Sequence, residues 1–137
     1  MTVRNALCVL VTSLAGCGCS FGPSASEKAE AGQISRAIDV LRAAPNPQKA
    51  ELLGALQQAS CENGDLCELK RVCVAGFAGH VSALSQTARA KSLLASGQAD
   101  AEAAQALSLA SAALAGSAPK LARCADAQGA AHRKYKF

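Results

Sequence analysis

The stretch DLCELKRVCVAGFAGHVSAL (residues 65–84) decides the fold class of this chain. Its apolar side chains recur at intervals of three and four residues, which is the spacing of one face of an α-helix, and β-branched residues are few. Asp65, followed by Glu68 three residues later, predicts the start of the helix, and Gly97 predicts its end. The expected inward positions are Leu66, Leu69, Cys73, Phe77, His80, Leu84 and Leu94. We therefore expect a long helix over residues 65–97.

Two shorter helices are expected before it. The first, over residues 26–44, opens with Ser24 and Glu27 at the spacing of a capping box. The second, over residues 47–60, has Pro47 at its first position, where the missing N–H costs nothing. The expected inward residues are Ile34, Ala37, Ile38 and Leu41 in the first helix and Leu52, Leu53 and Leu56 in the second.

A fourth helix is expected over residues 98–126, with a kink or a break at Gly116 and Pro119. Its expected inward residues are Leu107, Ala110, Leu114 and Leu121. The predicted fold is all-α: a four-helix up-down bundle or two packed helical hairpins, stapled by disulfides. Because the last two helices are the longer ones, their turn around residues 91–105 is expected to project beyond the other two.

The first residues have the character of a leader. Residues 1–5 carry one charge, Arg4, and residues 6–14 form a short apolar run. A run of roughly ten residues has the length of a signal-peptide core and is well short of the ~20 residues that span a bilayer.

The sequence LAGC (residues 14–17) follows this run, and it has the residue order of a lipobox. The segment thus resembles the precursors of bacterial lipoproteins. The resemblance implies removal of residues 1–16 as a signal peptide and a diacylglycerol thioether on Cys17, which holds the protein on a membrane. The alternatives are an ordinary secretory signal with a cysteine at its cleavage site, or a buried N-terminal helix. The resemblance covers residues 1–17 only.

Residues 17–25 then form a short tether rich in small and turn-forming residues, with a reach of roughly 16 Å if flexible. By resemblance to sorting rules in bacteria with two membranes, Gly18 in place of an aspartate favours the outer membrane. The expected location is its periplasmic face or the cell surface.

Four of the seven cysteines belong to the helical domain, expected over residues 26–127, and an oxidising compartment favours two disulfides among them. If the two long helices are antiparallel, Cys124 lies level with about residue 71, close to Cys73 on the inward face. We therefore predict the pairs Cys73–Cys124 and Cys61–Cys67, with Cys61–Cys73 and Cys67–Cys124 as the second choice. Closing the longer loop stabilises the fold by about 4 kcal/mol in the chain-entropy model.

Composition and motifs exclude several function classes. Removal of Arg4 with the leader leaves 13 basic against 10 acidic residues, a net charge of +3 that is too mild and too scattered for nucleic acid. No enzyme signature is present, and we expect neither catalysis nor a cofactor. Five residues lie between Cys61 and Cys67 and between Cys67 and Cys73, whereas zinc sites place two to four residues between paired ligands, so no metal is expected.

Gly76, Gly79 and His80 form the one unusual cluster within the long helix. Two glycines inside a helix cost about 1 kcal/mol each relative to alanine, which suggests that something uses the close approach they permit. One interpretation is tight helix packing with His80 hydrogen-bonded in the core. The other is a small pocket or ligand position.

The C-terminal residues 128–137 are expected to be a basic tail, with Arg133, Lys134 and Lys136 as candidate contacts to anionic headgroups. In an up-down bundle this end lies at the same pole as the tether. The predicted function is that of a small envelope lipoprotein acting as a structural or protein-binding module. Its expected partners are the bilayer, through the acylated Cys17, and an envelope protein. The alternative is a carrier of a small ligand or metal that uses the His80 region.

Overall fold

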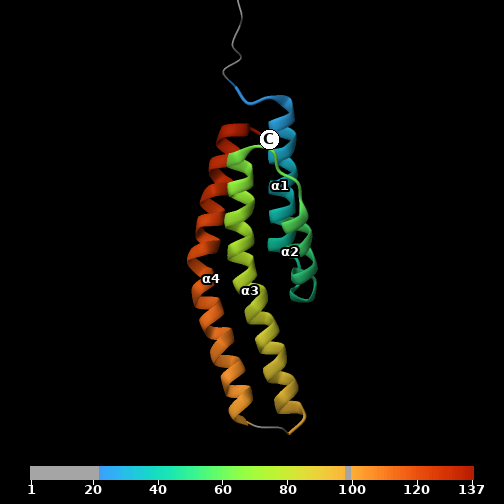
Figure 1. The fold of residues 1–137 in the computed structure, drawn as a ribbon, viewed down its shortest axis with the longest axis vertical. Helices are drawn as coiled ribbons and strands as arrows, with labels where there is room; N and C mark the ends of the chain where they lie inside the picture. Colours follow the sequence, from blue (N-terminus) through green and yellow to red (C-terminus); the bar gives the residue numbers. More distant parts are fainter. Residues whose placement is uncertain (1–21, 98–99) are drawn as a thin grey trace, which may run out of the picture.

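The computed structural model describes residues 22–97 and 100–137, and within these ranges every regular element is a helix (Figure 1). In chain order the elements are α1 (Ala25–Ala43), the 3₁₀ turn η1 (Asn46–Gln48), α2 (Lys49–Gln58), α3 (Gly64–Ala95) and α4 (Asp100–Tyr135). The all-α prediction is confirmed. The proposed lipid attachment at Cys17 falls outside the described residues.

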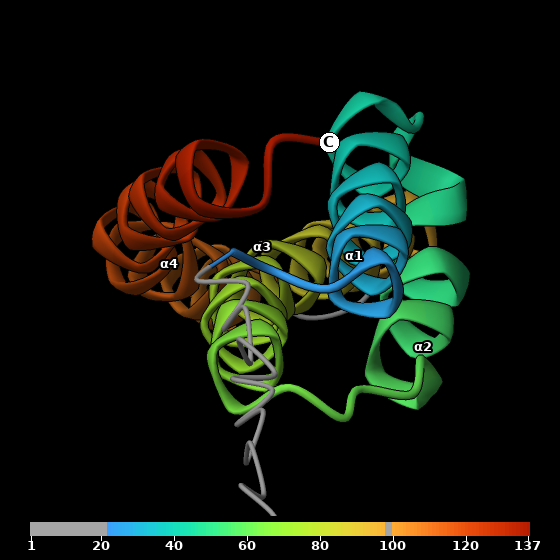
Figure 2. The same ribbon diagram turned by 90° about the horizontal axis from the view of Figure 1, so that it is seen from above.

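The helices form a short hairpin packed on one half of a long hairpin. α1 and α2 make the short hairpin, and α3 and α4, with 32 and 36 residues, make the long one. Seen along the bundle, α4 and α2 lie on opposite sides with α1 and α3 between them (Figure 2). The long hairpin extends well beyond α1 and α2, as the sequence predicts, and the start of α1 and the end of α4 share the opposite pole (Figure 1).

Two halves of the molecule follow from this arrangement. The stapled half comprises α1, η1, α2 and residues 64–82 and 115–135 of the long hairpin. The projecting half comprises residues 83–95 and 100–114, which continue past the end of α1, and the turn η1 lies beside the first of them, residues 84–91 of α3. Both names are used below in this sense.

Side-chain caps fix where the helices begin. Ser24 Oγ accepts from the Glu27 N–H at 3.2 Å, while Glu27 Oε2 accepts from the Ser24 N–H at 2.8 Å, so the predicted capping box is present. At the start of α3 the capping residue is Asn63 rather than Asp65, because Asn63 Oδ1 accepts from the N–H groups of Asp65 and Leu66. Asp65 lies within the first turn of the helix instead.

The fourth helix differs from its prediction in two ways. Of the predicted kink or break, the break does not occur, since α4 passes through Gly116 and Pro119 as one helix. The α3 helix packs against it on both sides of Pro119, at Ser117 and Leu121, which offsets the hydrogen bond that proline removes. α4 also continues to Tyr135, so residues 128–137 are not a tail. Tyr135 is only 1% exposed, and its burial holds the last turns in place.

The large buried side chains all lie in the stapled half. Its core consists of Ala31, Ile34, Ile38, Leu41, Leu53, Leu56, Leu66, Leu69, Cys73, Phe77, Cys124, Ala131 and Tyr135. In the projecting half the buried side chains are alanines only: Ala83, Ala90, Ala103, Ala106 and Ala110. The prediction that Leu94, Leu107 and Leu114 point inward is therefore wrong, since they are 53%, 47% and 47% exposed.

Candidate functional site

The four cysteines within the described residues form two disulfides. Cys61 pairs with Cys67 and Cys73 pairs with Cys124, with Cα–Cα distances of 5.3 and 4.6 Å. The first choice of pairing is confirmed and the second is wrong. Within residues 22–97 and 100–137 no group of three or more histidine, cysteine or acidic side chains is arranged to hold a metal ion.

The two glycines of α3 serve close packing of α3 against α4. A Cβ on Gly79 would lie 2.8 Å from Ser117 Cβ, and a Cβ on Gly76 would lie 3.1 Å from the Leu121 backbone nitrogen. α4 thus fills the space that a pocket beside these glycines would need. His80 is half-buried rather than part of the core. Of the two interpretations, tight packing describes the glycines, whereas the predicted hydrogen bond of His80 in the core does not form.

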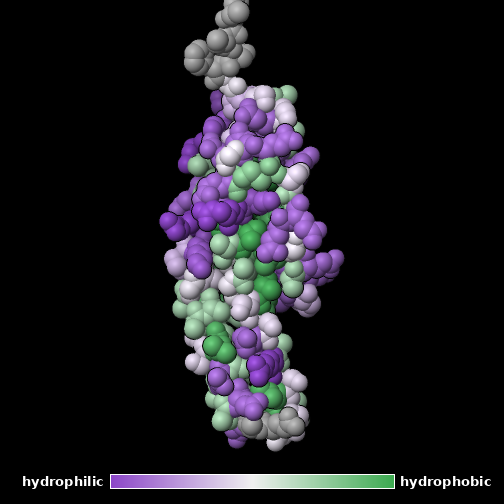
Figure 3. Space-filling view, in the orientation of Figure 1, coloured by the Kyte–Doolittle hydropathy of each residue, from purple (hydrophilic) through white to green (hydrophobic). Residues whose placement is uncertain are grey.

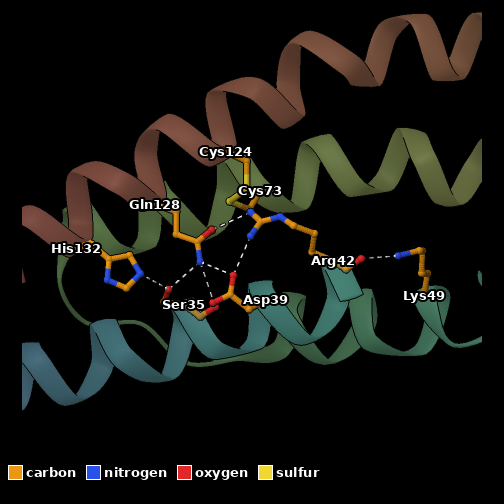
Figure 4. Close-up of polar contacts among 8 residues, drawn as sticks. All are labelled: Ser35, Asp39, Arg42, Lys49, Cys73, Cys124, Gln128 and His132. Atoms are coloured by element: carbon orange, nitrogen blue, oxygen red, sulfur yellow. Dashed lines mark hydrogen bonds and ion pairs between the residues drawn. A yellow bond between two sulfur atoms is a disulfide. The ribbon is translucent and has the colours of Figure 1, made fainter. Parts of the chain in front are cut away.

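Polar side chains join α1 to α4 (Figure 4). Two of them, Ser35 and Gln128, are buried, whereas Asp39, Arg42 and His132 are exposed. The side chain of Gln128 is buried, and its Nε2 donates to Ser35 Oγ at 2.7 Å and to Asp39 Oδ1 at 2.9 Å. Arg42 Nη2 donates to Gln128 Oε1 at 2.8 Å. Ser35 Oγ also shares a hydrogen bond with His132 Nε2 at 3.3 Å. Each polar group has a partner, as a buried network requires, so the cluster fixes the position of α1 on α4.

Lys49 closes the end of α1 in a similar way. Its Nζ donates to the carbonyl oxygens of Leu41 and Arg42, both at 3.0 Å, although most of its side chain is buried. The last carbonyls of a helix lack partners within the helix, and the positive charge of a lysine there also interacts favourably with the negative end of the helix dipole. No local pattern in the sequence indicates this cap, because Lys49 belongs to the next helix.

The basic residues at the end of α4 differ in what they contact. Lys134 Nζ donates to Asp65 Oδ2 on α3, and this hydrogen bond raises the pKa of Lys134 above its usual value. Arg133 and Lys136 are exposed. Beside them, the Tyr135 hydroxyl donates to Asn63 Oδ1 at 3.1 Å. The end of α4 is therefore docked on the start of α3, and the expectation of a free tail is wrong.

A hollow of about 260 Å³ lies between α3 and α4 at this pole, lined by Asp65, Leu66, Leu69, Ala131, Lys134 and Tyr135 among others. Its walls are mainly apolar, and the charged groups at its edge, Asp65 and Lys134, are paired with each other. The hollow offers space for a small apolar group but no set of groups arranged for catalysis.

The exposed side of α4 in the projecting half is the most unusual surface. From Ala103 to Pro119 the helix carries no charged residue. Leu107, Leu109 and Leu114 are each close to half exposed in this stretch. Pale and green surface prevails over this part of α4 in Figure 3, whereas charged side chains are denser over the upper half. An uncharged, leucine-bearing helix face in contact with water indicates a contact surface.

No known family, no curated protein and no solved structure matches this chain. Function is therefore argued from geometry. No helix within residues 22–97 and 100–137 has the length and apolar character needed to cross a bilayer.

Sequence reasoning had missed two parts of this site. The network around Gln128 left no trace in the sequence pattern, because a glutamine at an inward helical position does not reveal its partner. The exposed leucines were predicted to lie in the core, although one signal was present: alanines occupy positions 103, 106, 110 and 113, and a serine occupies position 117, at the spacing of a second, parallel face.

Proposed function

We propose that this chain is a small lipid-anchored envelope protein that acts as a structural or protein-binding module, with the projecting half as its contact element. The observation that carries the proposal is the projecting half itself, whose leucines are exposed while its buried positions hold alanine only. A helical hairpin without a third layer leaves apolar surface that a partner protein would cover.

The proposed anchor gives this element an orientation. The lipobox pattern in residues 14–17 precedes the first described residue, Gly22, by a few positions. The start of α1 lies at the pole where α4 ends (Figure 1). A bilayer holding Cys17 would face that pole, and the projecting half would point away from it. Arg133 and Lys136, exposed at the same pole, are proposed to contact anionic headgroups.

The two disulfides support an oxidising location outside the cytoplasm. In the bacterial envelope this is consistent with the periplasmic face of the outer membrane or the cell surface. The proposed module has no catalytic role, and its partner would be another envelope protein. No observation favours the alternative of a ligand or metal carrier at His80.

The anchor is tested by growing a bacterial host with an alkyne-labelled fatty acid. Wild-type protein should carry the label and should sediment with membranes. Cys17→Ser should abolish both, whereas the matched control Cys19→Ser should retain them. A Cys17→Ser protein that is still labelled and membrane-bound would refute the anchor.

The contact element is tested by crosslinking in the same host. A variant in which residues 87–110 are replaced by a short turn should lose the crosslinked partners that wild-type protein captures. Glu51→Lys on α2, away from the hairpin, is the control and should keep them. An unchanged partner set for the shortened variant, with intact disulfides, would remove the projecting half from the proposal.

A further inference from the structure

We propose that the side chain of Phe21 docks in the hollow between α3 and α4, at the pole where the chain enters α1, and so fixes the tether to the domain. Phe21 directly precedes Gly22, the first described residue. The docking itself does not depend on the proposed function, but its consequence for the anchored protein does.

The hollow has apolar walls and paired charges at its edge. Its volume is about 260 Å³, whereas a cavity of about 150 Å³ already accommodates a benzene ring. At the edge, Asp65 pairs with Lys134, and Glu68 pairs with Arg71. An apolar group that covers such walls removes them from water, which is favourable. The apolar residues that line the hollow come from both helices: Leu66, Leu69, Ala127, Ala130, Ala131 and Tyr135.

Hydrogen bonds connect the start of α1 to the wall of this hollow. The Ser24 N–H donates to Glu27 Oε2 at 2.8 Å, and Asn63 Nδ2 donates to Glu27 Oε1 at 2.7 Å. Asn63 Oδ1 in turn accepts from the Tyr135 hydroxyl at 3.1 Å, and Tyr135 lines the hollow. A path of three hydrogen bonds thus leads from Ser24 to the wall, so the tether meets the domain beside the hollow.

Residues 22–24 lead from α1 toward the ends of α3 and α4. In Figure 1 this segment leaves the top of α1 and crosses toward α4, and in Figure 2 it extends over the region between α3 and α4. Pro23 fixes its own φ and favours extended backbone at the preceding Gly22. Ser24 is extended as well, with φ −65° and ψ 164°. The segment is therefore a stiff arm that carries the chain toward the hollow.

Phe21 is the large apolar side chain that the tether offers at this place. Residues 17–25 read CGCSFGPSA, in which all other side chains are small or polar. Consecutive Cα atoms are about 3.8 Å apart, so one further residue brings Phe21 next to the end of the arm. An aromatic ring buries a large apolar area and has two rotatable bonds to order. The occupant that position and chemistry select is therefore Phe21.

Docking of Phe21 shortens the tether of the anchored protein, a consequence that rests on the proposed function. Four Cα–Cα steps lead from Phe21 back to Cys17, with a reach of at most about 14 Å. The pole of the stapled half would therefore stay at the bilayer surface, and the projecting half would stand away from it. An undocked, flexible tether would instead let the domain tilt in all directions.

Fluorescence tests the docking, because the chain contains no tryptophan. Phe21→Trp, in the full chain purified from the bacterial host in detergent, places a single tryptophan at the proposed contact. Ser20→Trp is the matched control one residue earlier. We expect blue-shifted emission and about 10-fold weaker quenching by iodide for Phe21→Trp than for Ser20→Trp, since burial of an aromatic favours the docked form by that factor or more. Equal quenching of the two proteins would overturn the docking.

Filling the hollow distinguishes docking from burial of the tryptophan in detergent or lipid. Ala127→Leu with Ala130→Leu adds aliphatic atoms to the wall, so quenching of the Phe21→Trp protein should rise to that of the Ser20→Trp control. Ala115→Leu with Ala122→Leu, at exposed positions outside the hollow, should leave the protection unchanged. A tryptophan that stays protected when the hollow is filled would overturn the docking. Protection that disappears on dilution would also overturn it, because the occupant would then come from a second copy.

Chymotrypsin, which cleaves after accessible aromatic residues, tests the native side chain. Cleavage after Phe21, identified by mass spectrometry, should be about 10-fold slower in wild-type protein than in Ala127→Leu with Ala130→Leu, because cleavage requires the undocked form. Ala115→Leu with Ala122→Leu should be cleaved at the wild-type rate. Circular dichroism should find the same helix content in all three proteins. Equal cleavage rates in the three would contradict the docking.

The docking and the proposed function fail separately. If Cys17→Ser abolishes acylation and membrane sedimentation but the tryptophan of Phe21→Trp is fully quenched, the anchor stands and the docking is wrong. If the hollow protects that tryptophan but Cys17 carries no fatty acid, the docking stands and the anchor is wrong.

Discussion

The stapled half and the projecting half share the two long helices α3 and α4, but they differ in which side chains of these helices are buried. In the stapled half, α1 and α2 cover the long hairpin, and large side chains such as Leu41 and Tyr135 are fully buried. In the projecting half only alanine is buried, and leucine faces water. Both regions have helical spacing of apolar residues, so the difference lies in whether a third layer is present. Apolar spacing alone therefore does not say whether a face is core or contact surface.

The largest expected effect comes from the covalent link within the stapled half. Replacing both Cys73 and Cys124 by alanine should lower the free energy of unfolding by about 4 kcal/mol, since it opens a loop of 51 residues. Replacing Cys61 and Cys67 in the same way opens a loop of only 6 residues and should cost about 2 kcal/mol. Urea unfolding of both double variants measures the two values. Equal losses would mean that loop length does not account for the stabilisation.

Truncating one leucine in each half compares the two kinds of packing directly. Leu41→Ala should cost about 3 kcal/mol, because Leu41 is fully buried and the change leaves a cavity. Leu114→Ala, at a residue 47% exposed, should cost less than about 1 kcal/mol. Thermal and urea unfolding at micromolar concentration provide the comparison. A loss of several kcal/mol for Leu114→Ala would show that Leu114 is buried in solution.

Glycine substitutions probe the seam where the two halves meet. Gly79→Ala should destabilise the protein by about 1–3 kcal/mol, because the new Cβ meets Ser117 and forces α3 and α4 apart. Gly116→Ala should instead stabilise it by up to about 1 kcal/mol, since nothing lies within 4 Å of that position and alanine favours helix. Urea unfolding should show changes of opposite sign in the free energy of unfolding of the two variants. Two stabilising substitutions would mean that the seam is looser than described.

The smallest expected effect is a pH dependence confined to the stapled half. The Ser24 backbone N–H is the main group that lowers the pKa of Glu27, and hydrogen bonds from Ser24 Oγ and the Asn63 side chain add to it. A lowered folded pKa contributes stability above the unfolded value, about 4.3, and that contribution is lost as pH falls through the folded value.

Glu27→Gln should therefore flatten the loss of stability as the pH falls below about 4.3, measured by urea unfolding between pH 3 and 6. Glu102→Gln in the projecting half serves as the control. A wild-type acid profile that is identical to that of Glu27→Gln would contradict the role of this cap.

Much of the fold could be predicted because it depends on local signals. Helix starts follow from side chains a few residues apart, as with Ser24 and Glu27. The cysteine pairing followed from helix length and the direction of two helices, which place Cys124 beside Cys73. Pro119 was a weaker signal. The backbone hydrogen bond that this proline removes is offset by packing of α4 against α3, which the sequence does not show.

The candidate site could be predicted only in outline. That the long hairpin projects follows from helix lengths. Which of its residues face outward does not follow from the sequence, because the leucine-bearing face of α4 and its alanine face have the same spacing and both are apolar. The contacts of Gln128, Lys49 and Lys134 join residues of different helices, so no local pattern in the sequence predicts them.

The sequence by itself determined the helices, their approximate lengths and the disulfide pairing, since capping, periodicity and helix geometry act over short distances. Only the tertiary structure decided that alanine rather than leucine fills the seam of the projecting half. A physical reason is the close approach of α3 and α4 where the projecting half begins, since Gly76, Gly79 and the Cys73–Cys124 bond hold the two helices together at the adjoining end of the stapled half. The same packing decided that residues 128–135 are helix and not tail, because Tyr135 is buried against α3 and α1 comes to lie on Gln128.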